Sequence, residues 1–413
     1  MLRGDSYREV FANRSFTVLW AGQALAHLGQ SITYVAVALY VYELTGSARD
    51  LSIALALQLL PWMVVGPVVG MLADHLGRKA ILVVAYALQA ALVALLPFTT
   101  TLGQIYALVF LSGLMAPVTE LTWAAALPSI VGQGLFVRGV SLEIVAFNAV
   151  NVVGPTAAGL LTSLVGARPV FFVVVACYLG ATALALQASI PGPPKPDEPL
   201  SLRGLWRGQV EAIQLLSKDR ILRYLVLLDV TVALGVIGPD IASLVYLTDT
   251  LQLGGREYGL LRGTVSFSMA LGVFVLGQHA SRLARQYMLL GGVLLVGLAY
   301  ALAGTGPSAV LLFGLWFVSG LGWAASWLTA DSLYAEVTPD AVRGRVYSIA
   351  AASYALAEAG TATLAGWMVN KFGPGIGLYV IGGAISLGAI AVAGLSGGHR
   401  AIARFNPNAD GAE

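Results

Sequence analysis

The chain has 413 residues, of which 58% are hydrophobic and 11% are charged, and its net charge is +2. Soluble globular proteins carry about 25% charged residues, so this composition, with a mean hydropathy of +0.81, excludes a soluble protein and offers no basic surface for nucleic acid. Cys177 is the only cysteine, which excludes an intramolecular disulfide.

Apolar runs of about 20 residues, the length of a helix that crosses a bilayer, recur along almost the whole chain. They predict an all-α integral membrane protein with twelve transmembrane helices in two halves of six. The expected spans of the first half are residues 16–44, 51–73, 80–98, 102–126, 135–165 and 170–190. Those of the second half are residues 221–251, 258–279, 287–303, 308–328, 346–369 and 375–395.

A proline-rich, charged stretch separates the two halves. Residues 191–199 hold five prolines together with Lys195, Asp197 and Glu198, and neither prolines nor charges suit a helix in lipid. We therefore expect an N-terminal bundle at 1–190, a cytoplasmic linker with an interfacial helix at 191–220, and a C-terminal bundle with a short tail at 221–413. Of the 23 Lys and Arg residues, 18 lie on the faces that share a side with the N-terminus, which predicts that both termini are cytoplasmic.

The turn between the second and third spans is the most informative sequence in the chain. It reads Gly70, Asp74, Gly77, Arg78 and Lys79 within ten residues. A related turn begins at residue 277, 207 positions later, with Arg285 in place of Arg78 and Ser281 in place of the acid. Residues 137–140 and 342–345 match at an offset of 205. Glu120 and Asp331 each lie eight residues before the prolines that we expect to end spans four and ten, Pro128 and Pro339. These matches predict a duplicated six-helix unit, with the two copies parallel.

This turn, in a chain of six plus six spans, resembles the major facilitator superfamily along essentially the whole length. Several stretches also resemble the bacterial exporters grouped with the enterobactin exporter and the macrolide efflux proteins. These stretches are residues 20–23, 43–47, 154–159 and 339–346.

The resemblance implies a secondary transporter that works by alternating access around a central site. It also implies a cytoplasmic gate in which the turn after span two closes against the start of span eleven. In that gate Asp74 would accept hydrogen bonds from backbone N–H groups and pair with Arg343 or Arg345. The residues expected in the gate are Gly70, Asp74, Gly77, Arg78, Lys79, Arg343 and Arg345.

Ionisable groups inside membrane spans are costly, so each one is a candidate for function. A carboxylate in apolar surroundings can take up and release a proton, and a histidine titrates near neutral pH. Structural ion pairs or a position near the interface are the alternative explanations. The candidates for proton coupling are Asp240, Glu358, Glu120, Asp331, Asp229 and His27.

Four polar residues of span one, Gln23, His27, Gln30 and Tyr34, are spaced to lie on one helical face. We expect this face to line the central cavity, although hydrogen bonding between helices would give the same spacing. Other candidates for the cavity wall are Asn148, Asn151, Trp323 and Trp327, and an aromatic wall favours a bulky amphipathic compound over a sugar.

Gly154, Pro155 and Gly159 in span five resemble the exporter motif of the superfamily, and they favour export over uptake. The sequence contains no phosphate-binding loop and no zinc-ligand spacing. We therefore expect a proton-coupled efflux transporter of the inner or plasma membrane, functional as a monomer, that is not an enzyme and needs no cofactor or metal. The alternatives are uptake or lipid movement by the same fold, or a membrane sensor that transports nothing.

Overall fold

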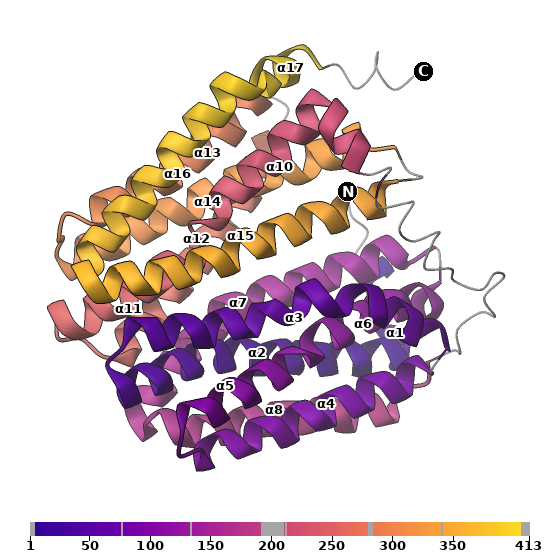
Figure 1. Ribbon diagram of the computed structural model, residues 1–413. Helices are drawn as coiled ribbons and strands as arrows, with labels where there is room; N and C mark the ends of the chain where they lie inside the picture. Colours follow the sequence, from indigo (N-terminus) through magenta and orange to yellow (C-terminus); the bar gives the residue numbers. More distant parts are fainter. Residues whose placement is uncertain are drawn as a thin grey trace. The chain divides into compact units, whose positions relative to one another are not determined.

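The computed structural model describes residues 5–75, 77–132, 134–190, 210, 213–279, 284–339 and 342–405, with the backbone alone at 5–6, 62–75, 278–279 and 344 (Figure 1). Every regular element within these residues is helical. The all-α fold expected from the hydropathy pattern is therefore confirmed. The linker at 191–209 and the end of the chain after residue 405 lie outside the described residues.

The helices of the first half follow one another with short connections. They are α1 (Asp5–Ala12), α2 (Arg14–Thr45), α3 (Ala48–His75), α4 (Arg78–Leu95) with the 3-10 turn η1 (Leu96–Phe98), α5 (Leu102–Gly113), α6 (Met115–Val131), α7 (Phe136–Val165) and α8 (Ala167–Gln187).

The second half repeats this pattern. Its helices are α10 (Arg220–Ala233), α11 (Ile237–Val245) with the π-helical turn η2 (Tyr246–Thr250), α12 (Gly255–His279), α13 (Arg285–Ala303), α14 (Ala309–Val337), α15 (Arg343–Phe372), α16 (Pro374–Ser396) and α17 (Gly398–Arg404).

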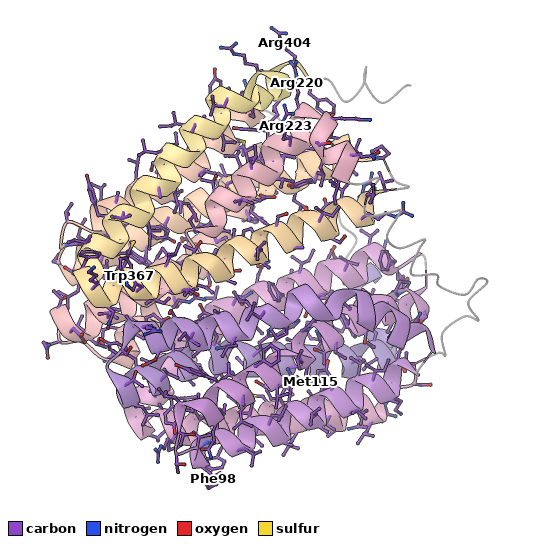
Figure 2. The ribbon with its side chains drawn as sticks, in the orientation of Figure 1. Phe98, Met115, Arg220, Arg223, Trp367 and Arg404 are labelled. Carbon is purple, nitrogen blue, oxygen red and sulfur yellow. The ribbon has the colours of Figure 1, made fainter. Side chains whose placement is uncertain are left out.

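Each expected span corresponds to one long helix or to a short series of helices. Among the described residues, ten such segments are long and apolar enough to cross a membrane. The helices α3 and α15 take the places of spans two and eleven. Large apolar side chains such as Phe98 and Trp367 remain exposed along the helices (Figure 2), as expected where the outer surface faces lipid rather than water.

Two of the expected span ends were wrong, and span seven is broken into two helices. Pro128 lies inside α6, which continues to Val131, so it does not end the span. The break in span seven lies at residues 234–236, ahead of Gly238 and Pro239. Proline fits the first turn of a helix, where its missing N–H needs no partner, so Pro239 helps to begin α11 rather than to kink a continuous helix. Span ten continues as α14 to Val337, nine residues beyond its expected end, and Asp331 is therefore helical.

The chain forms two compact units. Unit 1 comprises Met1–Gly46, Ile53–Pro199 and Gly254–Gly263, and unit 2 comprises Ser47–Ser52, Leu200–Leu253 and Thr264–Glu413.

The duplication is visible in the backbone of the two units. Both α7 and α15 contain 30 residues, and each ends at a glycine that also begins the next helix. Gly166 has φ 82° and ψ 167°, and Gly373 has φ 85° and ψ 163°. Side chains disfavour this left-handed region, so both positions need glycine. The two glycines are 207 residues apart, as are the two charged turns.

Glycines also let helices of unit 2 approach closely, as between α13 and α16. A Cβ atom added at Gly382 would meet the backbone N of Ala301 and the carbonyl oxygen of Gly297, closer than real Cβ atoms come. The next residue, Gly383, has nothing within 4 Å of an added Cβ. The two neighbouring glycines therefore differ only in whether another helix packs against them.

We expect Gly382→Ala to lower the thermal unfolding temperature of the purified protein in detergent, because the helices must separate to admit the methyl group. Overpacking of this kind costs about 1–3 kcal/mol. Gly383→Ala is the matched control and should unfold at or slightly above the wild-type temperature. Equal unfolding temperatures for the two variants would contradict the close packing of α13 on α16.

Candidate functional site

A buried polar cluster lies inside unit 1, where α2, α4 and α6 face one another. Gln23 and His27 of α2 are both buried. The hydroxyl of Tyr86 on α4 donates to Oε1 of Gln23, and Nε2 of Gln23 lies 3.1 Å from Nε2 of His27. Nε2 of His27 is also 3.6 Å from Oε2 of Glu120 on α6. Three helices are therefore joined by side-chain polar contacts.

The direction of these hydrogen bonds assigns the tautomer of the histidine. Because Gln23 accepts from Tyr86 through its oxygen, its amide nitrogen is the atom that faces His27, and an amide nitrogen can only donate. Nε2 of a neutral His27 is therefore the acceptor, and its ring proton is on Nδ1.

Glu143 of α7 completes this cluster, and sequence reasoning missed it. One ligand atom each of His27, Glu120 and Glu143 lie within 4.8 Å of one another. The indole nitrogen of Trp20 donates to the carbonyl oxygen of Leu142 at 3.1 Å, which fixes this part of α7 against α2. An acid inside an apolar span was the signal that could have identified Glu143, as it did Glu120.

The charge balance of this cluster decides what it can do. Among the described residues, no lysine or arginine forms an ion pair with Glu120 or Glu143. Two ionised carboxylates this close repel each other in a low-dielectric interior. The cluster can relieve that repulsion by holding a proton or another cation.

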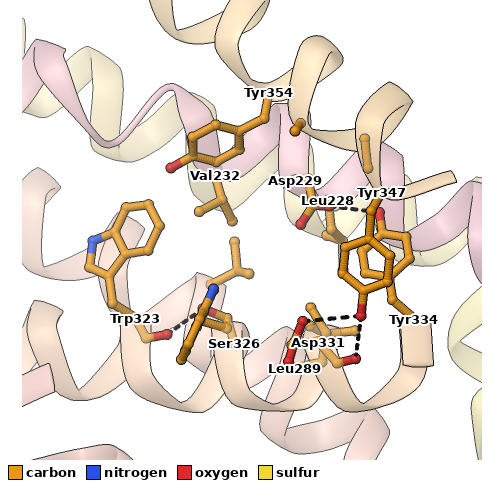
Figure 3. A pocket seen from close by; sticks show the side chains of 15 residues that line it. Leu228, Asp229, Val232, Leu289, Trp323, Ser326, Asp331, Tyr334, Tyr347 and Tyr354 are labelled. Atoms are coloured by element: carbon orange, nitrogen blue, oxygen red, sulfur yellow. Dashed lines mark hydrogen bonds between the residues drawn. The ribbon is translucent and has the colours of Figure 1, made fainter. Parts of the chain in front are cut away.

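Unit 2 contains a cavity of about 350 Å³ between α10, α13, α14 and α15 (Figure 3). Its walls are largely aromatic and apolar, and they hold two acids. The aromatic and acidic side chains that line it are Trp323, Trp327, Tyr334, Tyr347, Tyr354, Asp229 and Asp331.

Both acids of the cavity accept hydrogen bonds from tyrosines. The hydroxyl of Tyr334 donates to Oδ2 of Asp229 at 2.7 Å, and that of Tyr347 lies 3.2 Å from Oδ1 of Asp331. The two tyrosine rings are 5.6 Å apart. On the opposite wall, the indole nitrogen of Trp323 donates to the hydroxyl of Tyr300 at 3.4 Å. A cavity with these walls suits a flat apolar molecule that carries a positive charge or a hydrogen-bond donor.

The structure therefore groups four of the six candidates for proton coupling into two pairs, one in each unit. His27 lies beside Glu120, and Asp229 and Asp331 line the same cavity. Asp240 in the first turn of α11 and Glu358 in α15 are buried, but they are not among the residues that line this cavity.

The candidates for the cavity wall are divided in the same way. Trp323 and Trp327 line the cavity of unit 2, and Gln23 belongs to the buried cluster of unit 1. Gln30 and Tyr34 are half-buried, and Tyr34 lies under the guanidinium of Arg262 at 4.8 Å. Asn148 is exposed and Asn151 is half-buried. The polar face expected on span one is thus buried at Gln23 and His27 and more open towards Tyr34.

Arg78 of the charged turn, at the start of α4, contacts the end of α6. It is buried, and its Nη1 donates to Oγ of Ser129 at 3.3 Å. Arg285, its counterpart at the start of α13, forms an ion pair with Glu336 of α14 at 2.5 Å. In each pair, the two residues are 51 positions apart in the sequence. The repeated arginine therefore makes the same contact in both units, with a serine in one and a glutamate in the other.

Other residues expected in the gate are only partly placed. Gly77 is the exposed N-cap of α4, and Nζ of Lys79 donates to the carbonyl oxygen of Leu186 at 2.7 Å. Arg343 donates to the carbonyl oxygens of Ala335 and Thr338, and Arg345 is exposed. Gly70 and Asp74 lie in α3, but the Asp74 side chain is outside the described residues.

The glycines of α7 lie at a close crossing within unit 1. A Cβ atom at Gly159 would lie 2.5 Å from the carbonyl oxygen of Gly255 and 2.7 Å from Cα of Gly259. Gly154 and Pro155 are buried, and α7 continues through the proline. Gly255, Gly259 and Gly263 follow at four-residue spacing, a pattern typical of close helix packing in membranes, and sequence reasoning missed it.

Known proteins are similar to this chain over most of its length. The multidrug efflux pump Tap of Mycolicibacterium fortuitum is 25% identical over 81% of this chain and 83% of its own. Macrolide efflux protein A of Streptococcus pyogenes is 25% identical over 83% of this chain and 86% of its own.

Among solved structures, the nucleoside transporter NupG has a TM-score of 0.77 at 13% identity and covers 92% of this chain and 99% of its own. A bacterial homologue of the iron transporter ferroportin has a TM-score of 0.72 at 16% identity, over 93% of this chain and 98% of its own. These likenesses concern the fold. Residues 8–400 match the MFS_3 family of transmembrane secretion effectors, and the chain belongs to that family of major facilitator transporters.

Proposed function

We propose that this transporter exports a small amphipathic compound in exchange for protons, by alternating access. The observation that carries the proposal is the cavity of unit 2, where aromatic walls surround Asp229 and Asp331. Its volume of about 350 Å³ is in the range of sites that hold small molecules. The names of Tap and macrolide efflux protein A, which describe export of drugs, support this direction of transport.

In this proposal the buried cluster of unit 1 handles the proton. His27, Glu120 and Glu143 lie close together, and the repulsion between the two carboxylates favours uptake of one proton by the cluster. Tyr86 and Gln23 hold the imidazole in place, so that its Nε2 faces Glu120. Release of the proton restores the repulsion, which gives the cluster two states that differ in charge.

The setting of the transporter belongs to the same proposal. We infer an inner or plasma membrane location, both termini in the cytoplasm, a working monomer, and bundles at 1–190 and 221–413 joined by the linker 191–220. The gate formed by Asp74, Arg343 and Arg345 stays a prediction. Uptake of a fluorescent drug into everted vesicles, which corresponds to export from the cell, under an imposed proton gradient tests the function as a whole.

We expect Glu120→Gln to reduce proton-driven export at least about tenfold, because an amide keeps the shape and hydrogen bonding of the side chain but cannot bind and release a proton. Exchange of labelled for unlabelled drug without a gradient should persist, since that exchange needs no net proton movement. Both rates can be measured in the same vesicles. Glu43→Gln is the control, because Glu43 is an exposed acid near the C-terminal end of α2. This variant should leave both rates unchanged. Wild-type gradient-driven export in Glu120→Gln would exclude Glu120 as a coupling group.

We expect Trp323→Ala to raise the KM for aromatic drugs about tenfold, because loss of an aromatic contact costs about 1–1.5 kcal/mol. The KM for a small aliphatic substrate should change less. Trp367→Ala removes an exposed tryptophan that does not line the cavity and serves as the matched control. An unchanged KM in Trp323→Ala, with the control also unchanged, would show that the substrate binds elsewhere.

A further inference from the structure

A second hollow in unit 2 differs from the aromatic cavity in its chemistry. It has a volume of about 590 Å³ and lies between the start of α10 and the short helix α17. Three of the side chains that line it are arginines: Arg220 of α10, and Arg400 and Arg404 of α17. Figure 2 shows Arg220, Arg223 and Arg404 together at one end of the unit.

The position of α17 that creates this hollow is built into the sequence. Gly397 ends α16 with φ 68°, a left-handed conformation that favours glycine and turns the chain. At the next residue, a Cβ atom on Gly398 would collide with the side chain of Tyr224 and lie 2.9 Å from the carbonyl oxygen of Arg220. Ile402 of α17 is also buried. The helix is therefore packed against α10 and holds its two arginines in a fixed place.

The positive charge of the hollow is not balanced within the described chain. No aspartate or glutamate there forms an ion pair with Arg220, Arg400 or Arg404. The adjacent acid, Asp219, accepts from the backbone N of Ile221 and of Leu222, both at 2.8 Å, and so caps α10. Three guanidinium groups that share a hollow repel one another, and an anion between them would relieve this repulsion.

The hollow also lies where membrane-crossing segments end. The segment Arg220–Thr250 begins at it, and the segment Pro374–Ser396 ends two residues before α17. The apolar side chains Ile221 and Phe405 line it beside the arginines. Guanidinium groups bind phosphate oxygens in pairs of hydrogen bonds, and basic hollows at the cytoplasmic ends of membrane helices suit lipid headgroups.

We propose that Arg220, Arg400 and Arg404 form a binding site for a phosphate group, supplied by an anionic lipid of the cytoplasmic leaflet. The arginines hold the phosphate, and Ile221 and Phe405 contact the start of the acyl chains. The leaflet rests on the proposed orientation of the chain, whereas the binding itself does not depend on transport. Bound lipid would tie α17 to α10 and stabilise unit 2.

The test compares lipid binding to the purified full-length protein by native mass spectrometry and by thermal unfolding. We expect one phosphatidylglycerol to remain bound and to raise the unfolding temperature, whereas phosphatidylcholine does neither. The double variant Arg400→Gln with Arg404→Gln should bind phosphatidylglycerol at least tenfold more weakly. The pair Arg8→Gln with Arg14→Gln removes the same charge from exposed arginines of α1 and α2 and should bind as the wild type does.

Equal loss of binding in both double variants would mean that only net charge matters, and would overturn the site.

Inorganic phosphate and pyrophosphate test the other source of the anion: saturable binding of either, with no displacement by phosphatidylglycerol, would overturn a lipid ligand. The double variant Arg400→Lys with Arg404→Lys keeps the positive charge but loses the paired hydrogen bonds to phosphate. If the glutamine variant fails to fold, lipid binding is measured on this lysine variant instead, and weaker binding of phosphatidylglycerol is expected. Wild-type affinity in the lysine variant would then overturn the proposal. Because these readouts involve no drug, their failure is separate from any failure of export.

Discussion

The fold depends on one constraint, which is that polar groups inside a bilayer must find their partners within the protein. For the backbone, helices meet this requirement, and every regular element in the described residues is helical. For side chains, the requirement forces polar residues of different helices together. The bonds from Tyr86 to Gln23, from Gln23 to His27 and from Tyr334 to Asp229 all satisfy groups that lipid could not. The places where polar groups gather are therefore both structural joints and candidates for chemistry.

The same constraint explains how much the sequence could predict. The number of spans, the division into two similar halves and the choice of acids inside spans as candidates all follow from which residues avoid lipid. Within the described residues, ten of the expected spans correspond to helical segments long and apolar enough to cross a membrane. The two arginines of the charged turns, matched by spacing alone, make equivalent contacts with Ser129 and with Glu336. Patterns that repeat along one chain are visible without a structure.

Partners that come from distant helices are not visible in this way. Tyr334 donates to Asp229 across 105 residues, and Tyr86 to Gln23 across 63. From the sequence alone, either tyrosine could equally be interpreted as an apolar core residue or as an anchor at the membrane interface. The break in span seven shows a different limit. Gly238 and Pro239 mark a discontinuity, but the preference of proline for the first turn of a helix places the break before them.

The two units have similar series of helices, but their polar sites differ. Glu120 of α6 and Asp331 of α14 occupy matching helices, yet their surroundings differ in kind. Glu120 is beside an imidazole and a second half-buried carboxylate, whereas Asp331 lies in an open cavity beside a phenol. The two neighbouring carboxylates of the first environment repel each other when both are ionised, which favours uptake of a proton, whereas the second environment offers an aromatic surface. This difference favours proton exchange in unit 1 and recognition of the transported compound in unit 2.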